Sequence, residues 1–255
     1  MVVQMPAITL KINPEVFNDV YYPYLKKQFR YEVYYGGAGS GKSVFVAQKI
    51  VYKLLTQKMN LLVVRDTANT NRDSTFALLK QIINKWCGDE ADKLFTIRES
   101  DMRIKCVNGN EVIFRGLDDP EKIKSITFTN GELTDIWVEE ASEVEESSFQ
   151  QLDVRLRGGK TKKTIFLTFN PIDINHLLKK RFIDNPPENC NVLKTTYKDN
   201  KFIDDEYKAT LESFKFTDPY YYQVYCLNIT GAIKTLLIRW NSKRVKSWTI
   251  PSYNY

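Results

Sequence analysis

The sequence predicts an α/β fold in which a mostly parallel central sheet is flanked by helices. Predicted strands alternate with predicted helices along most of the chain, which implies right-handed crossovers and helices on both faces of the sheet. A glycine-rich stretch, GGAGSGKS at 36–43, lies between the first strand and the first helix. With 255 residues, of which 43% are hydrophobic and 27% charged, the chain has the size and composition of one large globular domain.

The first half of the chain contains two predicted strand and helix pairs and a hairpin. Hydrophobic periodicity predicts a strand, a helix, a strand and a helix, in that order, at 32–36, 42–58, 60–66 and 74–87. Asn108 and Gly109 separate two alternating runs, which predicts a tight hairpin over 103–116. The polar segment 119–125 is expected to form a short helix or a loop.

The second half continues the alternation of strands and helices. The apolar run at 133–140 predicts a strand that ends in acidic residues. The elements expected after it are a helix, a strand, a helix, a strand and two helices, at 147–157, 164–171, 174–183, 191–197, 204–215 and 219–228.

Several classes of function are excluded by composition. The four cysteines are far apart and form no CxxC pair, so neither a zinc site nor a disulfide framework is predicted. His176 is the only histidine, which excludes histidine metal clusters and Ser-His or Cys-His catalysis. The chain has no apolar run of about 18 residues and no secretory leader, so we expect a cytoplasmic protein without a membrane partner.

The positive charge is concentrated near the end of the sequence. The net charge is +6, and residues 231–255 contain five basic residues and no acid, so residues 1–230 are nearly neutral. Basic clusters at 155–163 and 179–181 could follow a phosphate backbone, or they could be ordinary solvated surface.

The glycine-rich stretch satisfies the pattern G-x-x-x-x-G-K-[ST] of a phosphate-binding loop, and its strand and helix flanks are those that the motif requires. Glycines allow the backbone N–H groups to approach phosphates, and the helix N-terminus adds partial positive charge. We expect Lys42 to reach the β- and γ-phosphates of ATP and Ser43 to hold Mg²⁺. The predicted nucleotide-binding loop consists of Gly36, Gly37, Ala38, Gly39, Ser40, Gly41, Lys42 and Ser43.

Polar side chains follow two later strands. Glu139 and Glu140 end the strand IWVEE, where hydrolysis requires one acid near the metal and one group beside the attacking water. We assign Glu139 to Mg²⁺ and Glu140 to the water, a division that requires the strand to end near Glu139. Thr168 and Asn170 end the next strand and could sense the γ-phosphate, or they could only cap the strand before a proline.

An ordered set of motifs resembles the ATPase domain of the large terminase subunit of tailed bacteriophages, of the PBSX or terminase-3 type. The likeness covers about residues 20–230. The segments that carry it are RYEVYYGGAGSGKS, VVRDTANTNRDSTF, FRGLDDPEKIKS, IWVEEASE and LTFNP. The resemblance implies an additional-strand, RecA-like P-loop NTPase that couples ATP hydrolysis to movement of double-stranded DNA.

The same resemblance implies partners and site residues. The partners would be double-stranded DNA, the portal protein and the small terminase subunit, with a ring of subunits on the portal in the bacterial host cytoplasm. By matching position, Lys42 and Glu140 would be catalytic residues, and Ser43 and Glu139 would bind the metal. Thr168 to Asn170 would form the segment that couples ATP hydrolysis to DNA movement. Arg30 and Tyr31 fall where relatives contact the adenine. Arg65 and Arg72 lie in a segment that relatives keep polar and basic, and their role is open.

Two departures from the family pattern affect these expectations. Many relatives have an arginine where this chain has Ala38, so another cation is needed near the γ-phosphate. The candidates are Arg115, Lys122, Lys124, Arg155 and Arg157. The nuclease domain that usually follows is expected to be absent, leaving an ATPase domain at 1–230 and a basic tail at 231–255. We attribute this tail to a frameshift, a split gene or a truncation.

Three functions remain open from the sequence. The leading prediction is the ATP-hydrolysing motor domain of a DNA-packaging terminase, without nuclease activity. The alternatives are a helicase-like DNA-dependent ATPase and a truncated nucleotide-binding assembly module with little turnover.

Overall fold

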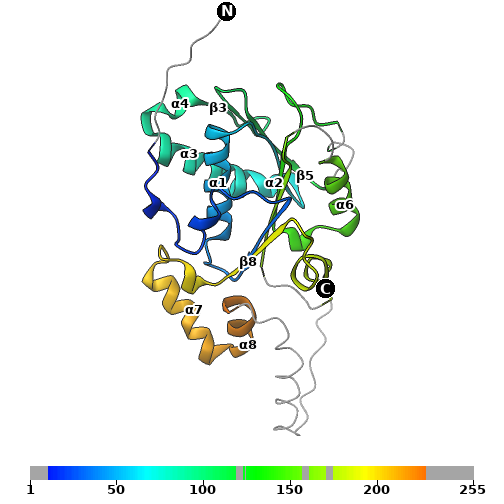
Figure 1. Ribbon diagram of the computed structural model, residues 1–255. Helices are drawn as coiled ribbons and strands as arrows, with labels where there is room; N and C mark the ends of the chain where they lie inside the picture. Colours follow the sequence, from blue (N-terminus) through cyan, green and yellow to red (C-terminus); the bar gives the residue numbers. More distant parts are fainter. Residues whose placement is uncertain (1–10, 119–122, 124, 157–160, 171–174, 228–255) are drawn as a thin grey trace, which may run out of the picture.

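The computed structural model describes residues 11–118, 123, 125–156, 161–170 and 175–227. Eight strands form one sheet at its centre (Figure 1). They are β1 Tyr31–Gly36, β2 Asn60–Arg65, β3 Phe95–Arg98, β4 Arg103–Cys106, β5 Glu111–Gly116, β6 Asp135–Glu139, β7 Thr164–Phe169 and β8 Cys190–Thr195. The strand order is β3-β4-β5-β2-β6-β7-β1-β8.

The sheet is mostly parallel, as predicted. In this spatial order, every neighbouring pair from β5 through β2, β6, β7 and β1 to β8 runs parallel. Strand β4 is antiparallel to both of its neighbours, β3 and β5. The predicted hairpin is the connection between β4 and β5, where Gly109 has a φ of 90°. That left-handed conformation suits glycine, which explains the Asn-Gly pair at this turn.

Helices and helical turns connect the strands. The α-helices are α1 Lys42–Thr56, α2 Ala68–Asn71, α3 Ala77–Cys87, α4 Ala91–Leu94, α6 Glu146–Arg155, α7 Asp205–Thr217 and α8 Pro219–Tyr221. Three π-helical turns are η3 Arg72–Phe76, η6 Lys179–Asp184 and η8 Tyr222–Cys226. The 3-10 turns are η1 Pro14–Val16, η2 Tyr22–Tyr24, η4 Gly88–Glu90, η5 Ala141–Glu143 and η7 Tyr197–Asp199.

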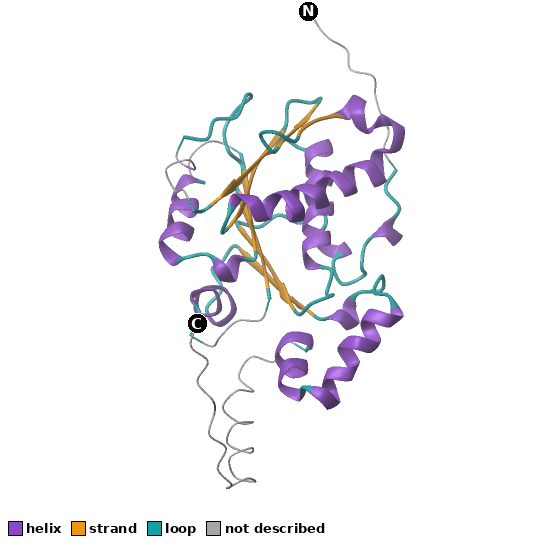
Figure 2. Ribbon diagram, turned by 180° about the vertical axis from the view of Figure 1, so that it is seen from behind, coloured by secondary structure: helices purple, strands orange, loops and turns teal. Residues whose placement is uncertain are grey.

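The two faces of the sheet bury separate hydrophobic clusters. Leu61 and Val63 of β2 pack on the side of α1 and α3, whereas Leu62 and Val64 pack on the side of α6. Figure 1 shows α1 and α3 on one side of the sheet and α6 on the other. A third, smaller cluster holds α7 and η8 together, and these helices lie beyond β8 in both views (Figure 2).

Some elements differ from the sequence-based expectation. The edge strand β3 was not predicted, because four residues are too few to give a clear alternating pattern. Helix α2 lies in the interval between the strand predicted at 60–66 and the helix predicted at 74–87. Most of 119–125, the start of the helix expected over 174–183 and the whole tail 231–255 lie outside the described residues. Among the residues that are described, no helix is long and apolar enough to cross a membrane.

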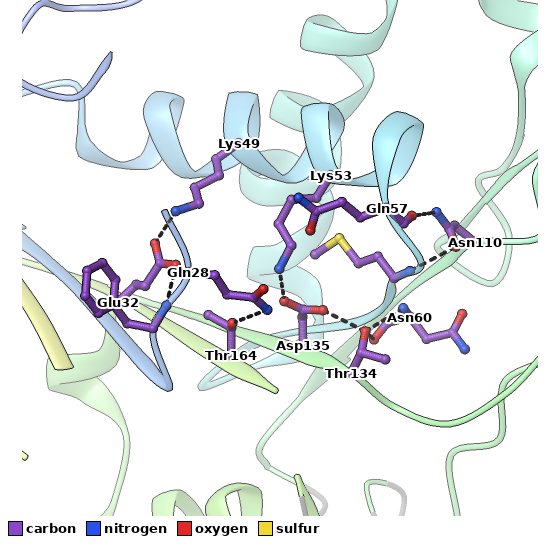
Figure 3. Close-up of polar contacts among 12 residues, drawn as sticks. Gln28, Glu32, Lys49, Lys53, Gln57, Asn60, Asn110, Thr134, Asp135 and Thr164 are labelled. Carbon is purple, nitrogen blue, oxygen red and sulfur yellow. Dashed lines mark hydrogen bonds and ion pairs between the residues drawn. The ribbon is translucent and has the colours of Figure 1, made fainter. Parts of the chain in front are cut away.

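Two buried lysines join α1 to the sheet (Figure 3). Lys49 donates to Glu32 of β1 at 2.6 Å, and Lys53, one turn later, donates to Asp135 of β6. All four side chains are at most 4% exposed. Lys49 also donates to the carbonyls of Tyr24 and Lys27, so its three N–H groups all have partners. Burial lowers the pKa of Lys49, and the charge of Glu32 opposes this shift.

We expect Lys49→Met to lower the free energy of unfolding by about 3–5 kcal/mol, because it leaves the Glu32 carboxylate buried without its cation. Lys80→Met is the matched control, since the Lys80 pair with Glu99 is largely exposed and should contribute about 1 kcal/mol or less. Chemical denaturation of both variants tests this. Equal losses in the two variants would contradict a special role for the buried pair.

Candidate functional site

The glycine-rich loop joins the end of β1 to the start of α1. β1 ends at Gly36 and α1 begins at Lys42, as the motif requires. Gly39 and Gly41 have φ values of 74° and 80°, a left-handed conformation in which glycine is strongly favoured. The backbone N–H of Phe45 donates to the Gly41 carbonyl and begins the helix.

Three residues that the sequence did not single out lie against the loop, and two of them donate hydrogen bonds to it. The Asn200 amide donates to the Gly39 carbonyl at 2.8 Å, and the Tyr21 hydroxyl donates to the Ser40 carbonyl at 3.0 Å. A Cβ on Gly37 would lie 1.9 Å from the carbonyl oxygen of Tyr225, so only glycine fits there. Burial raises the pKa of Tyr21 to about 12, which keeps its hydroxyl a neutral donor. No motif marks these contacts because they join distant segments.

Lys42 is buried at the start of α1 and donates to the Asn170 side-chain oxygen at 2.8 Å. Burial lowers the pKa of Lys42, while the charges of Glu140 and Glu139 oppose that shift. The expected loop lysine therefore lies against the residues that follow β6 and β7.

Ser43 and Glu139 meet directly, although 96 residues separate them in the sequence. The Ser43 hydroxyl donates to one oxygen of Glu139 at 2.7 Å, and the Thr168 hydroxyl donates to the other. Trp137 fixes Thr168 by donating its indole N–H to the threonine oxygen at 2.8 Å. Burial raises the pKa of Glu139, and the two hydroxyl donors oppose the shift. The expected metal-side residues are thus adjacent.

Glu140 leaves the strand in a different direction from Glu139. β6 ends at Glu139, and Glu140 has a φ of 51°, which is uncommon for a residue other than glycine. The Asn170 amide nitrogen lies 3.2 and 3.4 Å from the two oxygens of the Glu140 carboxylate. Asn170 therefore contacts both Lys42 and Glu140, and the two acids have the separate orientations that their expected roles require.

Arg30 and Tyr31 lie away from this group. Tyr31 begins β1, five residues before Gly36, so it is roughly 16 Å from the loop along the strand. Its hydroxyl and the Arg30 guanidinium both donate to Asp153 at 2.8 Å, and Arg181 donates to the same carboxylate. Both side chains are thus held at the amino end of β1, and the adenine contact expected for them stays a prediction.

The candidate cations that are described have other partners. Arg115 donates to the Phe114 carbonyl at 2.6 Å, and Arg155 donates to the Ile126 carbonyl at 2.6 Å. Lys122, Lys124 and Arg157 lie outside the described residues.

The donor set fits a magnesium nucleotide. The Ser40 hydroxyl is buried and has no hydrogen-bond partner within the described part of the chain, which leaves a free polar group inside the loop. Ser43 and Glu139 present the hard oxygen ligands that Mg²⁺ prefers. No group of three His, Cys, Asp or Glu residues that could hold a metal occurs in the described ranges. Phosphate oxygens and water would therefore complete the metal shell.

A solved structure of a phage protein shows the same fold. A large terminase from a thermophilic bacteriophage, solved in complex with ADP, has a TM-score of 0.66 and 17% identity. The likeness covers 84% of this chain and 53% of that one. At this level of identity the comparison establishes the fold.

Sequence comparison identifies the family. The chain is 32% identical over 236 residues to the PBSX phage terminase large subunit of Bacillus subtilis (strain 168), covering 85% of this chain and 52% of that protein. It is 31% identical over 192 residues to the terminase large subunit of Bacillus phage SPP1, covering 71% and 44%. The chain spans about half the length of these curated relatives. A family model described as phage terminase large subunit matches residues 28–228, and the chain therefore belongs to that family.

Proposed function

We propose that the chain is the ATP-hydrolysing motor domain of a terminase large subunit that drives packaging of double-stranded DNA into the procapsid. The observation that carries this proposal is the 2.7 Å hydrogen bond between Ser43 and Glu139, which joins the phosphate-binding loop to the acidic end of β6. Membership of the terminase large subunit family supports it.

In the proposed site, the loop at 36–43 binds the phosphates of ATP through backbone N–H groups and the N-terminus of α1. Lys42 neutralises the β- and γ-phosphates. Ser43 and Glu139 would hold Mg²⁺, which supplies positive charge to the phosphates when it is bound. Solved structures of the thermophilic phage terminase with ADP and with ATP-gamma-S support a nucleotide at this fold.

Three further residues act on the attacking water and on the coupling of ATP hydrolysis to DNA movement. Glu140 orients and polarises the attacking water, because its carboxylate leaves the strand separately from the metal-side Glu139. Asn170 contacts both Lys42 and Glu140. A change in how Lys42 contacts the phosphates would therefore be transmitted to Glu140 through the Asn170 side chain. Thr168 holds the Glu139 carboxylate from β7. These contacts support the coupling role expected for 168–170.

The proposed partners follow from the family. Double-stranded DNA is the translocated substrate, and the portal protein and small terminase subunit are the assembly partners. Several copies of the chain would form a ring on the portal in the bacterial host cytoplasm.

We expect Glu140→Gln to reduce ATP turnover by about 100-fold or more while ATP still binds, because the amide cannot accept the proton of water and the loop is unchanged. Steady-state phosphate release and binding of a fluorescent ATP analogue measure the two effects. Glu145→Gln, at an exposed acid beyond η5, is the control and should behave as the wild type. Undiminished turnover in Glu140→Gln would contradict the assignment.

The motor role predicts that double-stranded DNA and portal raise ATP turnover of the wild-type chain, since the translocated substrate and its docking platform complete the working assembly. Turnover should be compared with DNA alone, with portal alone and with both. Strand separation by the chain would instead indicate a helicase-like ATPase. Nucleotide binding without turnover under every condition would indicate an assembly module.

A further inference from the structure

The end of β2 places an arginine beside the acidic end of β6. The two strands pair in parallel with Val64 opposite Val138, so Arg65 is the next residue beside Glu139. Leu61 and Val63 of β2, and Trp137 of β6, pack in the cluster on the α1 side. Because side chains alternate along a strand, Arg65 and Glu139 both emerge on the side of the sheet that carries the phosphate-binding loop.

The contacts of Arg65 hold its guanidinium but use only part of its donor capacity. One terminal nitrogen donates to the Ser74 hydroxyl at 3.2 Å, and the other lies 3.7 Å from the Glu143 carboxylate. The side chain is 18% exposed. Its Nε is buried and has no hydrogen-bond partner among the described residues. A buried N–H without a partner is costly, and such a group in a folded protein calls for an explanation such as a ligand.

The charges around the phosphate-binding loop indicate which ligand the Arg65 guanidinium would bind. Glu139 and Glu140 add two carboxylates beside the place where a triphosphate would bind, and Lys42 is the one cation of the loop. Of the residues that end β1, β2, β6 and β7, Arg65 alone is a cation. Arg115 lies one strand farther from β6 and donates to a backbone carbonyl. Guanidinium groups suit phosphate because they present several N–H donors in one plane.

We propose that Arg65 binds the terminal phosphate of a nucleoside triphosphate held at the loop, and thereby distinguishes triphosphate from diphosphate. This inference rests on the proposed function, because it requires a nucleotide at residues 36–43. Ser74 and Glu143 would hold the guanidinium at the carboxyl end of β2, so that its N–H groups without a protein partner can reach the phosphate.

The test compares binding of ATPγS and ADP, both with Mg²⁺, by isothermal titration calorimetry on the full chain. We expect Arg65→Ala to weaken ATPγS binding about 10- to 100-fold, which corresponds to one lost charged hydrogen bond. ADP binding should change by less than about twofold, since ADP lacks the group that Arg65 contacts. Arg72→Ala is the matched control, because Arg72 is an exposed arginine seven residues later and should leave both affinities unchanged.

Three outcomes would overturn the inference. Unchanged ATPγS binding in Arg65→Ala would show that the arginine makes no phosphate contact. Equal losses for ATPγS and ADP would show that Arg65 only supports the loop. If the wild type binds neither nucleotide, the proposed function fails together with the inference. Arg65→Lys keeps the charge and should lose ATPγS affinity selectively but less severely, which keeps the test decisive if circular dichroism shows that Arg65→Ala is unfolded.

Discussion

The position of α1 over the sheet is the constraint on which the site depends. The helix begins at the phosphate-binding loop, and three of its polar side chains are fixed to strands: Ser43 to β6 at the site, then Lys49 to β1 and Lys53 to β6 farther along. Hydrophobic contact alone would allow a helix to slide or rotate slightly on a sheet. Charged pairs inside the core prevent this movement, because a displaced ion would be left buried without its partner.

The geometry of the sheet explains why residues so distant in the sequence form one site. β1, β6 and β7 are adjacent and parallel, so their carboxyl ends meet at one edge. Ligands of open parallel sheets bind at that edge. The loop follows β1, Glu139 ends β6, Glu140 follows it, and Asn170 follows β7, which is why these residues lie together.

Much of this arrangement is predictable from the sequence. The loop pattern and the acids after an apolar run determine where Lys42, Ser43 and Glu139 must lie once the strands are assumed parallel. The contacts of Tyr21 and Asn200 with the loop are not predictable, since each joins a short irregular segment to a backbone carbonyl far away in the chain. Arg30 and Tyr31 show a further limit: a family motif locates them in the sequence, but Asp153 of α6 determines where their side chains point.

The amide of Asn170 has a direction, and that direction has a consequence for sequence variation. Its oxygen faces an ammonium group and its nitrogen faces a carboxylate. Rotating the amide by 180° would oppose like polarities at both ends, so only one orientation is stable. Aspartate has nearly the same shape but no donor, and it would add a third carboxylate next to Glu139 and Glu140. A substitution that is conservative in volume is therefore not conservative here, because the site selects the polarity of the side chain.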